Sequence, residues 1–235
     1  MGAIYLVRHG QASFGAADYD QLSDLGVRQA TLLGQWLVQT GQDLSLLVTG
    51  SHRRHKQSSN ACLAAWLPNG ERAPQVLQDP GFDEFDHQQV LLRLMPEFAD
   101  PAVLAAYLAQ QENPARAFQK VFAKAVARWV SGQHDGDYSE SWAVFKARCN
   151  AALARLLEAA GKGQSAWVFT SGGPVSAICQ QLLAIPDRQI FELNWALVNT
   201  GVTKLLHGPG RVSLSYMNSY AHLESARDPG LVSYR

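Results

Sequence analysis

The N-terminal stretch Ile4-Tyr5-Leu6-Val7-Arg8-His9-Gly10 decides how the rest of the chain is interpreted. Its first four residues are aliphatic, β-branched or aromatic, which is typical of a short strand buried on both faces of a sheet. Arg8, His9 and Gly10 follow directly, so we expect them at the carboxyl end of that strand. A basic and a titratable side chain at such a position are candidates for function.

Strands and helices are predicted to alternate from this first strand onward. Apolar residues recur at helical spacing from Leu25 to Trp36, and a second short apolar run covers Leu44 to Thr49. A longer helical stripe from Trp142 to Leu156 precedes a third buried run, Ala166 to Thr170. This order places helices on both faces of a parallel sheet. We therefore expect an α/β fold, a three-layer α/β/α sandwich with a mostly parallel central sheet.

The remaining segments predict a hairpin and an insertion. Val202 to Leu206 and Val212 to Met217 flank glycines and a proline and are predicted to pair, and the tail after Glu224 is expected to be irregular. Prolines interrupt the region from about residue 68 to 113, which we interpret as an insertion or lid. Residues 1–235 are therefore expected to form a single domain that carries this lid.

Composition excludes several classes of protein. The 235 residues carry 20 basic and 20 acidic side chains, so no net charge attracts nucleic acid or an anionic membrane. No run approaches the roughly 18 uncharged apolar residues of a membrane span, and the N-terminus lacks the features of an export signal. We expect a cytoplasmic protein without nucleic-acid or membrane partners, whose three cysteines are reduced and buried. An anionic ligand would have to be met by a local cluster of positive groups.

Three predicted strand ends supply groups suited to a phosphoryl ligand. Arg8 and His9 follow the first strand, Arg54 lies shortly after the second, and Ser171 and Gly172 follow the third. The planar fork of arginine matches phosphate oxygens, and N–H groups at a helix start bind anions. In open α/β sheets, ligands bind beyond the carboxyl ends of the strands. We predict that the arginines, the serine and the glycine bind phosphate and that the imidazole attacks phosphorus.

Glu84 is the candidate proton donor for the leaving oxygen. Aromatic and acidic neighbours surround it in the sequence, a setting that raises the pKa of a carboxyl group toward the range of a general acid. The candidate substrate-pocket residues are Ser13, Phe14, Phe82 and His87. For the phenylalanines the alternative to a pocket is packing in the core, and for the histidine it is a position on the surface.

These segments resemble the histidine phosphatase superfamily, which includes the cofactor-dependent phosphoglycerate mutases. The resemblance covers most of the chain and implies a phosphoglycerate mutase-like fold. It also implies that His9 is transiently phosphorylated, that Arg8 and Arg54 bind the phosphoryl group, and that Glu84 protonates the leaving group. The segments that carry the resemblance are Leu6 to Gln11, Leu22 to Ala30, Thr49 to Ser58, Glu84, Glu140 to Trp142, Asn218 and His222-Leu223.

One position departs from the pattern of the family. The second histidine of the family follows the third strand as a His-Gly pair, whereas this chain has Ser171-Gly172. A neutral hydroxyl in place of a charged imidazole predicts a loss of activity between about tenfold and about a hundredfold or more. The expected function is hydrolysis of phosphomonoesters through a phosphohistidine on His9. The alternatives are a degenerate protein that binds a phosphorylated ligand without turnover and a phosphoglycerate-type mutase.

Several other interpretations stay open. Ser171 at a turn between strand and helix is similar to the nucleophile elbow of serine hydrolases, although Phe169 stands where that motif has glycine and no acid-then-histidine pair follows. His52 and His55 have the i, i+3 spacing of metal ligands without an apparent third ligand, so supporting or exposed roles are expected. We expect no metal and no cofactor. The expected partner is a small phosphorylated substrate or inorganic phosphate, and a homodimer is one candidate assembly.

Overall fold

The computed structural model describes residues 2–13, 20–67, 74–161 and 163–234. Its centre is a six-stranded sheet with the strand order β3-β2-β4-β1-β5-β6. The first four strands in this order are mutually parallel, and β5 pairs antiparallel with both β1 and β6. The predicted mostly parallel sheet and the predicted hairpin are therefore confirmed. The strands are β1 (Gly2–Arg8), β2 (Leu46–Thr49), β3 (Val76–Gln78), β4 (Ser165–Thr170), β5 (Val202–Gly208) and β6 (Arg211–Ser219).

Alternate residues of β1 pack against different helical layers. Ile4 and Leu6 belong to the hydrophobic cluster that includes Phe145 and Ile178. Tyr5 and Val7 belong to a second cluster on the other face, with side chains from the first two helices. A strand that is apolar on both faces must be covered on both, which explains why the run from Ile4 to Val7 has no polar alternation.

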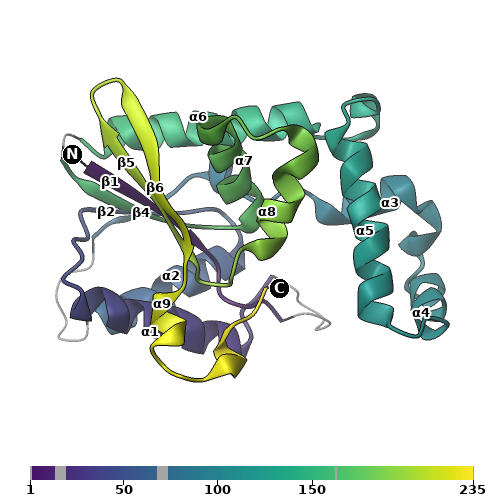
Figure 1. Ribbon diagram of the computed structural model, residues 1–235, viewed down its shortest axis with the longest axis horizontal. Helices are drawn as coiled ribbons and strands as arrows, with labels where there is room; N and C mark the ends of the chain where they lie inside the picture. The colour runs from purple at the N-terminus through teal and green to yellow at the C-terminus, as the bar shows by residue number, and fades with distance from the viewer. Residues whose placement is uncertain (1, 14–19, 68–73, 162, 235) are drawn as a thin grey trace.

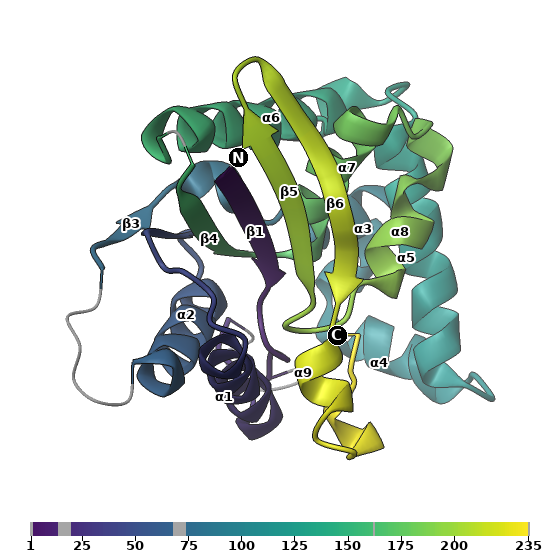
Figure 2. The ribbon, with the colours of Figure 1, turned by 60° about the vertical axis from the view of Figure 1, so that its left-hand side comes forward.

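Helices cover both faces of the sheet and form the predicted three-layer sandwich. In Figure 2, α1 and α2 lie on one side of the strands and α6 and α7 on the other. All three cysteines are free and buried in these layers, as predicted. The α-helices are α1 (Asp24–Gln39), α2 (Arg53–Trp66), α3 (His87–Leu94), α4 (Pro101–Ala109), α5 (Pro114–Val130), α6 (Trp142–Ala159), α7 (Gly172–Leu183), α8 (Ile190–Ala196) and α9 (Ala221–Glu224).

Local sequence sets the ends of the helices that matter for the site. The Ser23 hydroxyl accepts a hydrogen bond from the backbone N–H of Gly26 at 3.1 Å and so caps the start of α1. Gly41, with a φ of 60°, follows the other end of that helix in a left-handed conformation that glycine adopts without strain. Ser141 caps α6 in the same way as Ser23 caps α1. These contacts therefore define where α1 and α6 begin and where α1 ends.

The region predicted to be a lid contributes both to the sheet and to a separate group of helices. Within residues 68–113, β3 pairs with β2 along the edge of the sheet. Helices α3 and α4, together with α5, lie side by side at one end of the molecule, away from the strands (Figure 1). That this region acts as a lid stays a prediction.

The C-terminal segment folds back toward the end of β1. Beyond α9 it is irregular apart from one 3₁₀ turn, Pro229–Leu231, as expected for the tail. The buried Gln29 amide donates to the Leu231 carbonyl at 2.7 Å, and the backbone N–H of Asn199 donates to the Ser233 carbonyl at 2.8 Å. The tail is thereby fixed next to the residues that follow the first strand. Over the described residues, no helix is long and apolar enough to cross a membrane.

Candidate active site

The carboxyl ends of three parallel strands meet at one edge of the sheet. The backbone N–H of His9, directly after β1, donates to the Thr170 carbonyl at the end of β4 at 2.8 Å. The backbone N–H of Gly50, directly after β2, donates to the Phe169 carbonyl at 3.1 Å. The parallel register therefore brings the three predicted strand ends together, as the sequence analysis expected.

A backbone carbonyl fixes the tautomer of His9. Its Nδ1 lies 2.7 Å from the Gly10 carbonyl oxygen, which can only accept, so Nδ1 carries the hydrogen and donates. The lone pair of a neutral imidazole must then be on Nε2. The His9 backbone is held in turn by the Asn199 amide, which donates to the His9 carbonyl at 3.0 Å. The ring is thus oriented by main-chain contacts on both sides of it.

The surroundings of His9 favour the uncharged imidazole. Its side chain is buried, and burial lowers the pKa of His9 well below its usual value. The nearby guanidinium groups of Arg54 and Arg8 lower that pKa further. At neutral pH the ring is therefore neutral, and its Nε2 lone pair is available for attack on an electrophile.

The two predicted phosphate-binding arginines reach this edge from different elements. Arg8, at the end of β1, donates to the Leu197 carbonyl through Nη1 and to the Tyr234 carbonyl through Nη2 at 3.0 Å. A Cβ atom built on Gly172 would lie 3.8 Å from Arg8 Nε, so this guanidinium stands beside the start of α7. Arg54, in the first turn of α2, is only 5% exposed. Its Nη1 donates to Asp20 Oδ1 at 2.7 Å.

Glu84 lies against the N-terminus of α7. The backbone N–H of Gly173 donates to Glu84 Oε2 at 3.2 Å. A Cβ atom on Gly173 would stand 2.0 Å from Glu84 Oε1, so glycine is required for the carboxyl group to approach this closely. The first turn of α7 therefore joins Glu84 to Ser171 and Gly172.

Ser171 has a partner that the sequence analysis did not identify. Its side chain, fully buried at the N-cap of α7, makes no capping hydrogen bond and instead lies with Oγ 2.7 Å from Nε2 of His55. The His55 ring is also completely buried, and its centroid is 5.8 Å from that of the His9 ring. Asp83 Oδ1 is 3.8 Å from Nδ1 of His55, and the Ser51 backbone N–H donates to the same oxygen at 2.5 Å.

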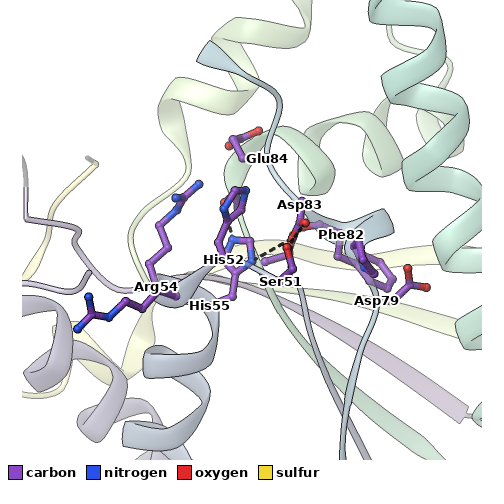
Figure 3. A network of polar contacts seen from close by, with 12 residues as sticks. Ser51, His52, Arg54, His55, Asp79, Phe82, Asp83 and Glu84 are labelled. Atoms are coloured by element: carbon purple, nitrogen blue, oxygen red, sulfur yellow. Dashed lines mark hydrogen bonds and ion pairs between the residues drawn. The ribbon is translucent and has the colours of Figure 1, made fainter. Parts of the chain in front are cut away.

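Figure 3 shows His55, Ser51 and Asp83 together, with Glu84 near His52 and His55 and a dashed line from Ser51 to Asp83. His55 was interpreted from the sequence as a supporting or exposed residue in a basic run. A signal for its burial is present, because His55 shares one face of α2 with Ser58, Ser59, Cys62 and Trp66, at spacings of three, four, seven and eleven residues. All of these residues are buried.

The predicted substrate-pocket residues differ in their burial. Phe82 is fully buried in the core against α6, so its proposed place in a pocket is wrong: its side chain packs in the core, and its carbonyl accepts a hydrogen bond from the Thr170 hydroxyl at 2.6 Å. His87 is an exposed residue at the start of α3, and Ser13 is half-buried. Phe14 lies outside the described residues. A pocket role for Ser13 and His87 stays a prediction.

Two other sequence patterns have structural explanations. The Asn218 side chain accepts from the Val198 backbone N–H at 2.8 Å and donates to the Ala196 carbonyl at 2.8 Å, which ties the end of β6 to the segment after α8. His222 Nε2 lies 2.8 Å from the Thr200 hydroxyl, in a buried position. Within the described ranges, no group of three or more His, Cys, Asp or Glu side chains could hold a metal ion.

The assembled groups are suited to one kind of chemistry. A neutral imidazole whose Nε2 lone pair is not used by the Gly10 contact, two guanidinium groups and a helix N-terminus can receive and stabilise a phosphoryl group. A carboxyl group on the same helix terminus can exchange a proton with an oxygen of the ligand. The fold and the site therefore define the class of the protein as a phosphoryl-transfer enzyme.

Residues 4–220 match the family model described as the histidine phosphatase superfamily, branch 1. The chain belongs to this superfamily, as its sequence motifs led us to expect. Membership of this superfamily supports phosphatase or mutase activity in general. No curated protein sequence matches the chain at a significant level.

Solved structures share the fold at low sequence identity. A phosphoglycerate mutase from Bacillus anthracis superimposes with a TM-score of 0.66 at 17% identity, covering 96% of both chains. A phosphoserine phosphatase mutant from Entamoeba histolytica, solved with phosphoserine, gives a TM-score of 0.64 at 16% identity over 95% of this chain and 100% of that one. A mycobacterial glucosyl-3-phosphoglycerate phosphatase gives 0.60 at 18% identity, covering 92% and 98%. The phosphoglycerate mutase-like α/β fold is thereby confirmed.

Proposed function

We propose that this protein is a phosphatase that hydrolyses phosphomonoesters through a phosphohistidine on His9. The observation that carries the proposal is the contact between His9 Nδ1 and the Gly10 carbonyl, because it leaves the Nε2 lone pair as the nucleophile. The lowered pKa of His9 keeps that lone pair free of a proton at neutral pH. The guanidinium groups of Arg54 and Arg8 are near enough to His9 to lower its pKa, so they can hold the charge of a phosphoryl group bound to that ring.

The reaction follows in two displacements. Nε2 of His9 forms a bond to phosphorus while the bond from phosphorus to the ester oxygen breaks, and the protonated Glu84 carboxyl gives its proton to the leaving oxygen. Water then attacks the phosphorus of the phosphohistidine and loses a proton to the Glu84 carboxylate. The N–P bond breaks, inorganic phosphate leaves, and both side chains return to their starting states. Arg8 and Arg54 hold the charge of the non-bridging oxygens in both steps.

The groups of the helices α3 to α5 favour hydrolysis over mutase activity. A mutase must bind its substrate in a second productive pose, and the helices α3 to α5 show no group that we can assign to such a pose. Two of the three structural neighbours given above are phosphatases by description. The substrate class that these observations support is a small phosphomonoester, with inorganic phosphate as product.

A second candidate function is binding of a phosphorylated ligand without efficient turnover. The observation that favours it is Ser171, which stands at the position that the family resemblance assigns to a second histidine. Such a protein would retain phosphate binding at Arg8 and Arg54 and would form no covalent intermediate. Equilibrium binding of phosphate without hydrolysis would identify this case.

Hydrolysis of a generic aryl phosphate by wild type and His9→Ala separates the two candidates. Wild type is expected to turn over, and His9→Ala is expected to lose at least about a thousandfold in kcat while it still binds phosphate. His207→Ala is the matched control, because His207 is a buried histidine at the opposite end of the sheet, paired in register with Gly2. Activity that survives in His9→Ala would contradict the proposed function.

A further inference from the structure

The contact between His55 and Ser171 places a second buried imidazole at the candidate active site. The His55 side chain has no exposed surface, and a Cβ atom on Gly50 would stand 2.3 Å from its Nδ1. Glycine at position 50 therefore makes room for the ring beside the ends of β2 and β4. The Ser171 hydroxyl does not cap α7 and lies 2.7 Å from this buried ring, so helix capping does not explain the contact.

The hydrogen shared by this pair has two arrangements. The Ser171 hydroxyl can donate to Nε2, in which case Ser171 presents only lone pairs to a ligand. Alternatively, Nε2–H donates to Oγ, and the hydroxyl hydrogen of Ser171 is free to point elsewhere. An anionic phosphoryl oxygen at the start of α7 attracts a donor and repels lone pairs, so its arrival selects the second arrangement. His55 then fixes the direction of the Ser171 O–H.

We propose that His55 and Ser171 act as one unit, in which Ser171 donates its hydroxyl hydrogen to the phosphoryl group passing to His9 and His55 positions that hydroxyl. This inference rests on the proposed function. Ser171 is the catalytic residue of the pair, since it contacts the reacting group, and His55 is a positioning residue that acts through it. The pair thereby supplies an imidazole from α2 in place of the histidine expected after β4.

The groups around His55 suit this role. His9, His52, Arg54 and Lys56 disfavour a positive charge on the ring, and together with burial they lower the pKa of His55 well below its usual value. Asp83 faces Nδ1 from the segment after β3 at 3.8 Å and is fixed by both donors of Ser51. With the ring neutral, Asp83 favours a proton on Nδ1. A phosphoryl anion beside Ser171 adds negative charge on the other side and favours a proton on Nε2. The ring takes this proton from water and releases the Nδ1 proton to water, so it stays neutral.

Moving the imidazole from position 55 to position 171 tests the proposal. The variants are Ser171→Ala, His55→Ala, His55→Gln and the double variant His55→Ala with Ser171→His, measured for kcat and KM on an aryl phosphate, for acid-labile phosphate on His9, and for thermal unfolding. We expect His55→Ala and Ser171→Ala each to lose about 10- to 100-fold in kcat with a smaller change in KM. His55→Gln keeps an N–H donor and is expected to retain more activity than His55→Ala. The double variant is expected to recover to within about tenfold of wild type.

The recovery separates positioning from a structural role, because a variant that only loosens the fold gains nothing from a second substitution. Ser171→Ala removes a single oxygen, so it reports on the pair even if His55→Ala fails to fold. Ser59→Ala is its control, a fully buried serine on the same helix as His55. The inference would be overturned if Ser171→Ala and His55→Ala both kept the wild-type kcat, or if the double variant were no more active than His55→Ala. In either case an inactive His9→Ala would leave the proposed function standing. A wild type without phosphohistidine would overturn both.

Discussion

The end of β1 and the first turn of α2 each carry a buried histidine, and their hydrogen-bond partners give the two rings different roles. His9 donates from Nδ1 to a carbonyl and leaves Nε2 free, whereas His55 uses Nε2 for Ser171 and turns Nδ1 toward Asp83. Burial and nearby positive groups lower the pKa of both. The difference lies in which nitrogen is occupied, and that decides which ring can attack phosphorus.

Arg54→Ala is the substitution on α2 with the largest expected effect. It removes a buried guanidinium that stabilises transferred charge, so kcat/KM is expected to fall about a thousandfold. Arg53→Ala is the matched control, since it removes the same charge from an exposed position of the same turn and is expected to stay within about twofold of wild type. Steady-state kinetics on an aryl phosphate measure both. Equal losses would mean that net charge, and not the position of Arg54, is responsible.

Glu84→Gln tests whether Glu84 protonates the leaving oxygen, separately from the attack of His9 on phosphorus. Glutamine cannot protonate the leaving oxygen, so hydrolysis of an alkyl phosphate, a poor leaving group, is expected to slow about a hundredfold. For a nitrophenyl phosphate, whose leaving oxygen needs little protonation, kcat/KM reports the first displacement and is expected to fall only a few fold, whereas kcat falls further because the second displacement loses its base. The ratio of the two kcat/KM values is the measurement. An unchanged ratio would place the proton donor elsewhere.

Ser171→His in the wild-type background sharpens the comparison of the two histidines. The His55 ring already occupies the space next to Ser171 Oγ, so an added imidazole overpacks the site. We expect kcat to fall about tenfold and the melting temperature to drop, even though the substitution restores the residue that the family resemblance predicts. A gain in rate would show that His55 leaves room for a second ring and takes no part.

The pH dependence of stability is expected to show both rings. The folded-state pKa of each lies well below the ordinary 6.5, so the unfolded chain takes up protons first as the pH falls. Stability is therefore fully present above about pH 6.5 and decreases below it, by at most about 1.4 kcal/mol per pH unit for each histidine. Urea unfolding at pH 7.5 and 5.5 is expected to show a shallower decrease in His9→Gln and in His55→Gln than in wild type. His134→Gln, at an exposed position, is the control, and equal slopes in all four proteins would contradict the burial of neutral rings.

The sequence predicts most strands of the sheet and the candidate site residues that directly follow β1 and β4. Strands buried on both faces must be continuous apolar runs, so β1 and β4 stand out, and the residues after them are automatically candidates. His55 escapes this logic because its role depends on the face of α2 on which it lies. Helix α2 begins at Arg53, and its first turns are basic and polar, so its apolar pattern becomes evident only further along the helix. Reading the buried face back from Trp66 to His55 would have found it.

The same limit explains the misplaced phenylalanine. An aromatic residue such as Phe82 suits a substrate pocket and the core equally well in the sequence, and the backbone decides between them: Phe82 ends the 3₁₀ turn Pro80–Phe82, whereas Glu84 lies beyond that turn. The Phe82 side chain enters the core while the Glu84 carboxyl reaches the start of α7. Neighbours in the sequence share a site only when the backbone between them turns both side chains to it.

The most direct test of the account is the position of phosphate on the trapped enzyme. Wild type and Glu84→Gln, denatured rapidly in alkali during turnover of a nitrophenyl phosphate, can be examined by ³¹P NMR and by peptide mapping. The account predicts phosphohistidine on His9 with phosphorus on Nε2, because Nδ1 is committed to the Gly10 carbonyl. Phosphorus on Nδ1, phosphate on Ser171 or His55, or turnover without any phosphoenzyme would contradict it.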